Sequence, residues 1–146
     1  MTRSVVLTEG STIPSVALPV MFLPPDRFIQ HEVAAEYFFV EGCHITEWWN
    51  SPHDAEVSVA RARVEPGVTT RWHRLRGVTE RYLILEGQGR VEIGDGWIEN
   101  TGSGAVVFIP AGVCQRITNI GLTPLVFLAL CTPRFTPACY EDLEPA

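Results

Sequence analysis

The chain has 146 residues, a length that suits one domain with a substantial buried core. Its residues are 46% hydrophobic and 19% charged, with 12 Gly and 11 Pro, which excludes a disordered chain and indicates short elements joined by turns. The formal net charge is -6 and the 11 basic residues are scattered arginines, so we expect no basic surface for nucleic acid or an anionic membrane.

The apolar runs of the chain are short. No continuous apolar stretch follows Arg3, and the longest run elsewhere, LVFLAL, is far too short to span a bilayer. We therefore expect a cytoplasmic protein. Reduced thiols are expected in that compartment, and no CxxC spacing occurs among the four cysteines, Cys43, Cys114, Cys131 and Cys139.

The N-terminal region is rich in proline. Pro14, Pro19, Pro24 and Pro25 deny it a long helix, so residues 1–36 are predicted to form an extended arm and lead-in. Within this arm lies the apolar segment VALPVMFL, which a small domain cannot readily bury by itself. We therefore expect the arm to pack on a second copy of the chain, giving a homodimer.

Strand signals begin after the arm. Aromatic and β-branched residues dominate residues 38–49, and the segment EVSVARARV then alternates, with Arg61 and Arg63 on one face of a strand. Two arginines on one face suggest a ligand or a partner.

Short strands account for most of the remaining chain. Gly- and Pro-rich turns such as EPG, GDG and PAG separate them, and no helical period intervenes. Regularly spaced short strands are typical of an all-β sandwich or barrel. The predicted strands are residues 70–73, 80–86, 89–93, 105–109, 115–118 and 125–131.

Two motifs carry a family resemblance. The pattern G-x5-H-x-H-x(3,4)-E-x6-G is matched by Gly67, His73, Glu80 and Gly87. The pattern G-x5-P-x-G-x2-H-x3-N is matched by Gly104, Pro110, Gly112 and Asn119. In this order the two motifs resemble those of the cupins, which are small jelly-roll β-barrels. The resemblance implies a single cupin barrel at residues 37–132, followed by a cap segment at residues 133–146.

The sequence departs from the family at two positions. Leu75 stands where the first motif has its second histidine, and Gln115 stands where the second motif has its histidine. In family members that bind metal, these two positions and those of His73 and Glu80 hold one divalent ion inside the barrel. Only His73 and Glu80 carry over unchanged.

The altered set can still be interpreted as a metal site. His73, Glu80 and Gln115 would hold a divalent transition metal such as Mn, Fe, Ni or Zn, with the Gln115 carbonyl as a weak ligand. The resemblance then implies isomerase, lyase or cyclase chemistry on a small organic molecule. We expect that molecule to contact Leu75 and Tyr82 and to have its anionic group bound by Arg61, Arg63 or Arg71.

Two alternatives lack the metal. Arg71 shares a strand face with His73 and could pair with Glu80 in place of the ion. Glu80 and His73 would then act as an acid and base pair on a sugar or keto acid. In the other alternative the same pocket binds a small molecule without turnover, because one fold hosts many functions.

Overall fold

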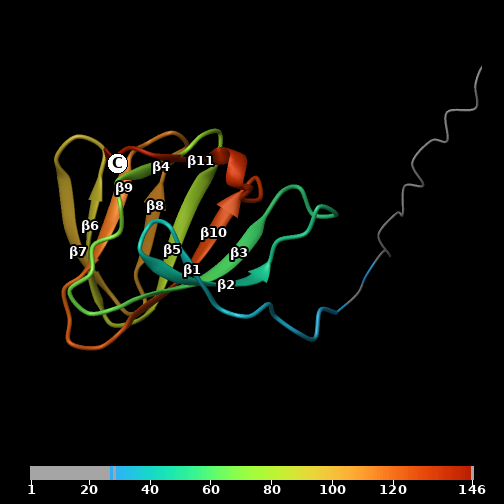
Figure 1. Ribbon diagram of the computed structural model, residues 1–146, viewed down its shortest axis with the longest axis horizontal. Helices are drawn as coiled ribbons and strands as arrows, with labels where there is room; N and C mark the ends of the chain where they lie inside the picture. Colours follow the sequence, from blue (N-terminus) through green and yellow to red (C-terminus); the bar gives the residue numbers. More distant parts are fainter. Residues whose placement is uncertain (1–26, 28, 146) are drawn as a thin grey trace, which may run out of the picture.

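The computed structural model describes Arg27 and residues 29–145, which form two facing β-sheets (Figure 1). One sheet has the strand order β1-β2-β3-β10-β5-β8 and the other has the order β11-β4-β9-β6-β7. The strands are β1 (Tyr37–Phe39), β2 (Cys43–Trp49), β3 (Ser58–Val64), β4 (His73–Leu75), β5 (Thr79–Glu86), β6 (Gln88–Ile93), β7 (Trp97–Gly102), β8 (Val106–Ile109), β9 (Gln115–Asn119), β10 (Leu125–Thr132) and β11 (Tyr140–Asp142). The predicted all-β fold is confirmed.

Helix is nearly absent from the described part of the chain. Its one helical element is a 3-10 turn, η1 (Pro137–Cys139), between β10 and β11. Of the described helices, none is long and apolar enough to cross a membrane.

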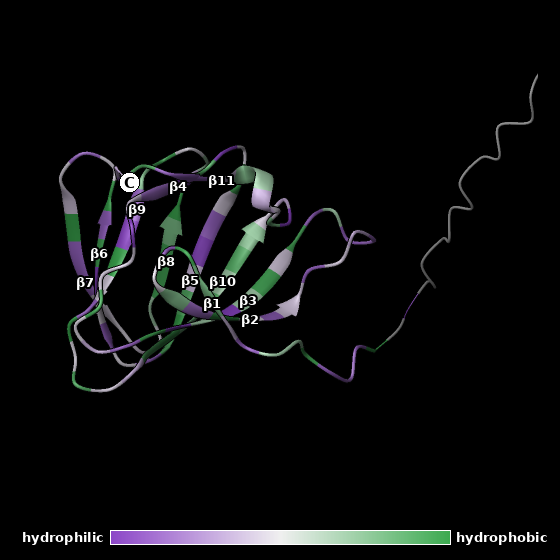
Figure 2. Cartoon of the chain, viewed as in Figure 1, coloured by the Kyte–Doolittle hydropathy of each residue, from purple (hydrophilic) through white to green (hydrophobic). Residues whose placement is uncertain are grey.

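The core lies between the two sheets because the strands alternate between apolar and polar residues. In β3, Ala62 and Val64 are buried, while Arg61 and Arg63 between and beside them are only partly covered. Figure 2 shows the resulting bands of hydrophobic and hydrophilic residues along the strands. The main buried cluster joins residues from both sheets, including Phe127 of β10 and Ile117 of β9.

The structure differs from the sequence prediction at three strands. The strand expected at residues 70–73 is β4, which begins at His73 and ends at Leu75. β7 and β11 were not predicted. β7 is a sheet edge with mostly exposed residues, and β11 is a three-residue strand in the proline-bounded tail, so neither has a buried alternating pattern. β11 pairs with β4 and forms one edge of the second sheet.

A tight turn brings β1 and β2 against the start of β4. Gly42 has a φ of 101°, which L-residues with a side chain rarely adopt, and its N–H donates to the carbonyl of Phe39. The next residue back, Glu41, accepts a hydrogen bond at its carbonyl from the N–H of Arg71, at 2.8 Å. This contact joins segments 30 residues apart and places the Glu41 side chain beside β4.

The VALPVMFL segment, on which the homodimer prediction rests, lies at residues 16–23 and so outside the described residues. The homodimer therefore stays a prediction.

Candidate functional site

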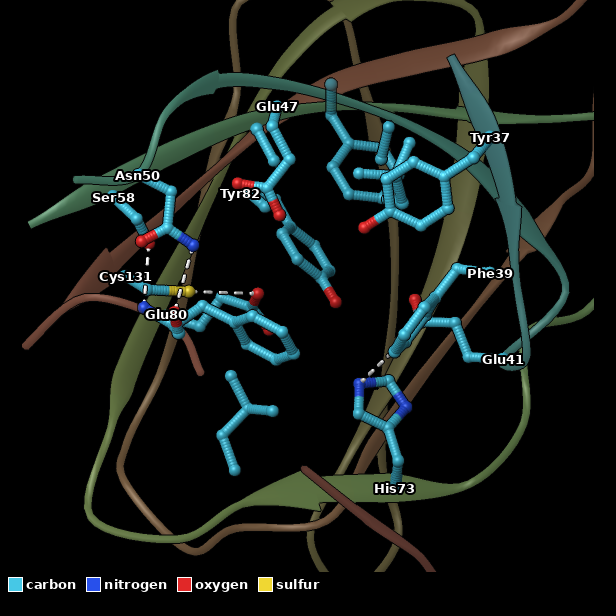
Figure 3. Close-up of a pocket in the computed structure, with 17 residues that line it drawn as sticks. Tyr37, Phe39, Glu41, Glu47, Asn50, Ser58, His73, Glu80, Tyr82 and Cys131 are labelled. Carbon is cyan, nitrogen blue, oxygen red and sulfur yellow. Dashed lines mark hydrogen bonds and ion pairs between the residues drawn. The ribbon is translucent and has the colours of Figure 1, made fainter. Parts of the chain in front are cut away.

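A cavity opens between the two sheets (Figure 3). Its volume is about 60 Å³, counted as the space in which the centre of a water molecule fits. The cavity therefore has room for a small organic molecule. The side chains that line it come from β1, β2, β3, β4, β5 and β10 and from the turns beside them.

His73 lines this cavity and is 2% exposed. Its Nδ1 is 2.8 Å from the carbonyl oxygen of Arg71, which can only accept, so Nδ1 carries a proton. Nε2 faces the carboxylate of Glu41, with 3.4 Å between Nε2 and Oε2. The ring of Tyr140 stacks on the imidazole at 5.2 Å. The backbone contact thus sets the ring orientation and directs Nε2 toward the cavity.

Glu80 lies on a different wall, on β5, and each of its carboxylate oxygens has a partner. Gln115 Nε2 donates to Oε1 at 2.8 Å, and the thiol of Cys131 donates to Oε2 at 3.4 Å. The amide oxygen of Gln115 in turn accepts a hydrogen bond from the Tyr82 hydroxyl at 2.5 Å. A buried chain from Tyr82 through Gln115 therefore holds the Glu80 carboxyl in one position.

Burial raises the pKa of Glu80, because it removes water from the charged form, and the negative charge of Glu41 raises it further. His73, Gln115 and Cys131 act in the opposite direction but do not reverse the shift. Burial also raises the pKa of the Cys131 thiol and holds the pKa of Tyr82 well above its usual range. Cys131 and Tyr82 therefore act as neutral hydrogen-bond donors to this network.

The structure brings the three predicted metal ligands together. Gln115 contacts Glu80 directly and is paired with His73 across β4 and β9. Other groups of the chain, however, already lie against their donor atoms: Nε2 of His73 faces Glu41, both oxygens of Glu80 accept hydrogen bonds from Gln115 and Cys131, and the Gln115 oxygen accepts one from Tyr82. Among the described residues no group of three His, Cys, Asp or Glu side chains is placed to hold a metal ion. The arrangement therefore does not fit the ion that the family resemblance implies.

The predicted substrate contacts divide into two groups. Leu75 and Tyr82 line the cavity, and Leu75 follows His73 at the two-residue spacing that puts both on one face of β4. Arg61 and Arg63 do not line it, because the alternate residues Ala60 and Ala62 face inward.

All three candidate arginines are paired with acidic residues elsewhere. Arg61 and Arg63 both contact Glu36, which lies before β1. Arg71 pairs with Asp142 at 2.9 Å and is 3.5 Å from Glu144. The alternative pair of Arg71 with Glu80 is therefore not formed.

Several cavity residues were not predicted, and those with polar or aromatic side chains ahead of both family motifs include Tyr37, Phe39, Glu41 and Glu47. These four lie in or beside β1 and β2. Ile45 and Glu47 line the cavity at alternate positions of β2, so a pleat pattern was present, but it does not say which face is inside. Glu41 reaches the site only through the turn at Gly42, which has no periodic signal.

A family model described as a cupin domain matches residues 60–131 of the chain. An uncharacterised protein of Methanocaldococcus jannaschii is 34% identical over 87 residues, which are 60% of this chain and 66% of that protein. The chain thus spans slightly less than two thirds of the length of this curated relative.

Solved structures show the same fold. An uncharacterised conserved protein with a double-stranded β-helix domain, from Klebsiella pneumoniae, aligns with a TM-score of 0.62 at 15% identity, over 73% of this chain and 89% of that one. Oxalate decarboxylase of Bacillus subtilis, a protein with Mn(II) centres, aligns with a TM-score of 0.64 at 24% identity, over 75% of this chain and 30% of that one. At these identities the likeness establishes the fold alone.

Proposed function

We propose that this chain, which belongs to the cupin superfamily, binds a small organic molecule in the barrel and transfers a proton on that molecule without a metal ion. Two side chains that can carry a proton, His73 and Glu80, line the same cavity. One observation carries this proposal: His73 and Glu80 line the same cavity but have different neighbours. His73 faces a carboxylate, whereas Glu80 accepts a hydrogen bond from an amide. Two titratable groups whose surroundings differ in this way are suited to separate acid and base roles.

Glu80 is suited to the role of base. A carboxyl whose pKa is raised by burial binds a proton more strongly than one in water, and it is ionised when the pH exceeds that raised pKa. Gln115 and Cys131 each donate to one of its oxygens, which stabilises the ionised form that accepts a proton. The base would take a proton from a carbon next to a carbonyl group.

His73 is suited to the role of acid. With Nδ1–H on the Arg71 carbonyl, a second proton on Nε2 makes an imidazolium that Glu41 stabilises at 3.4 Å. Nε2–H would give its proton to the carbonyl oxygen as Glu80 takes the carbon-bound proton, so that an enol forms with no net change of charge. Return of a proton to the same or the neighbouring carbon completes an exchange or an isomerisation.

The proposal differs from the metal-dependent mechanism that the sequence suggested in the role given to the predicted metal-ligand atoms. Every predicted ligand atom has a partner within the chain, and those partners are the ones that position Glu80 and His73. Binding without turnover is the alternative outcome, since the same cavity would capture a ligand.

Hydrogen exchange on carbon tests the proposal directly. The protein is incubated in D2O with aminoacetone, hydroxyacetone and pyruvate, which have similar size and different charge, and loss of the carbon-bound proton signals is followed by NMR. We expect catalysed exchange with at least one of them and a loss of about 100-fold or more in Glu80→Gln. Glu36→Gln is the matched control, because Glu36 pairs with Arg63 outside the cavity. Exchange with none, or an unchanged rate in Glu80→Gln, would contradict the proposal.

A further inference from the structure

The cavity is acidic. Three carboxyl groups line it, those of Glu41, Glu47 and Glu80, and the basic side chain among the described lining residues is His73, which Glu41 already contacts. Carboxyl groups withdrawn from water need a proton or a positive partner. The described arginines do not supply one, since none of them lines the cavity.

The walls are aromatic. Tyr37, Phe39, Tyr82, Phe127 and Phe135 contribute rings, and Figure 3 shows the hydroxyl groups of Tyr37 and Tyr82 directed toward the open space. Phe39 stands edge-on to Phe135 with ring centroids 6.3 Å apart, and Tyr82 packs on Phe127 at 4.3 Å. These ring contacts hold the walls in place. Aromatic faces attract cations through their quadrupole, and most strongly where water is excluded.

We infer that the site takes a small organic cation, whose ammonium group lies among the aromatic rings and the carboxylates of Glu41 and Glu47. The inference deepens the proposed function and rests on it for the location of the ligand. An anionic ligand would meet three carboxyl groups and no arginine in this cavity. A neutral ligand would leave Glu47 without a positive partner among the described lining residues, because His73 already faces Glu41. The size of the cavity suits a small molecule.

Glu47 is the residue that separates this inference from the acid–base mechanism. It lines the cavity from β2 but takes no part in the Tyr82–Gln115–Glu80 network or in the His73–Glu41 contact. Burial and the nearby Glu47 carboxylate raise the pKa of Tyr37, which is 42% exposed and so lies where the cavity meets solvent. Glu47 is therefore placed to attract the positive charge of the ligand where the cavity meets solvent.

Three probes of one shape test the inference by isothermal titration calorimetry: choline, the neutral 3,3-dimethylbutan-1-ol and the anionic 3,3-dimethylbutanoate. We expect choline to bind at least about tenfold more tightly than the neutral probe, and the anion to bind most weakly. Glu47→Gln should weaken choline binding about three- to tenfold and leave the neutral probe unchanged. Glu36→Gln, with its carboxyl group outside the cavity, should bind all three probes like the unaltered protein.

Failure of this inference can be told apart from failure of the proposed function. The three probes report binding alone, and choline and the neutral probe contain no carbonyl group on which hydrogen exchange could occur. Equal binding of choline and the neutral probe, tighter binding of the anion, or binding of none of them would overturn the inference. Carbon-bound hydrogen exchange with the uncharged or anionic carbonyl compounds would still support the proposed function. Selective choline binding without any exchange would uphold the inference and contradict the catalytic role.

Discussion

Gln115 donates a hydrogen bond from Nε2 to Oε1 of Glu80 at 2.8 Å, inside the barrel. A histidine at this position would be a metal ligand in the family pattern, whereas the amide here is a donor to the carboxylate. Its oxygen is used by the Tyr82 hydroxyl. The substitution thus replaces a metal ligand with a residue that links two protein side chains.

Tyr82→Phe should lower the free energy of unfolding by about 1–3 kcal/mol, because it removes the hydroxyl donor and leaves the buried Gln115 oxygen without a partner. Urea unfolding measures this change. Combining Tyr82→Phe with Gln115→Leu should destabilise less than the sum of the two single changes, since both break the same contact. Strict additivity would show that the contact contributes nothing to stability.

Leu75→His should create metal binding. Leu75 lines the cavity on the same face of β4 as His73, so an imidazole there would add a third donor beside His73 and Glu80. Titration with Mn, Ni and Zn, followed by calorimetry, measures the gain. Arg74→His is the matched control, because Arg74 points away from the cavity and pairs with Glu141. Equal metal affinity in the two variants would contradict the placement of residue 75.

Glu80→Gln should change how stability depends on pH. The raised pKa of Glu80 means that the folded state binds a proton more strongly than the unfolded state, whose reference value is 4.5. Stability of the unaltered protein should therefore fall, relative to Glu80→Gln, as pH rises from that value through the raised pKa. Below it the difference should be constant. Chemical unfolding of both proteins across this range tests the sign, and a difference that grows in the opposite direction would contradict it.

Thiol labelling should be selective for Cys114. The side chains of Cys43, Cys131 and Cys139 are buried and burial raises the pKa of each thiol, whereas Cys114 is partly exposed. Iodoacetamide applied to the folded protein should modify Cys114 first, as read by peptide mass spectrometry. Early modification of Cys131 would show that the Glu80 network is open to solvent.

Part of the site could be predicted from the sequence. The motif spacing and the two-residue period of strands placed His73, Leu75 and Glu80 inward, and Gln115 and Tyr82 are found with them. These positions were predictable because each lies within a short strand of regular pleat, close to a motif glycine.

The remaining part depends on contacts that periodicity does not encode. Arg61 and Arg63 do lie on one face of β3, as predicted. It is the opposite face, with the small residues Ala60 and Ala62, that lines the cavity, and alternation alone does not say which face is the inner one. β2 also shifts register against β3 between Glu47 and Trp49, which interrupts the pleat. Glu41 joins His73 through a turn and a hydrogen bond between distant segments, which only the folded chain reveals.

The most direct test of the metal-independent account is elemental analysis of the untagged protein after reconstitution with Mn, Fe, Ni and Zn, with its carbon-bound hydrogen exchange measured on the same sample before and after chelation. The account predicts no stoichiometric metal, and exchange that a chelator leaves unchanged. One bound metal ion per chain, lost in His73→Ala together with the exchange activity, would contradict it and make Gln115 a metal ligand.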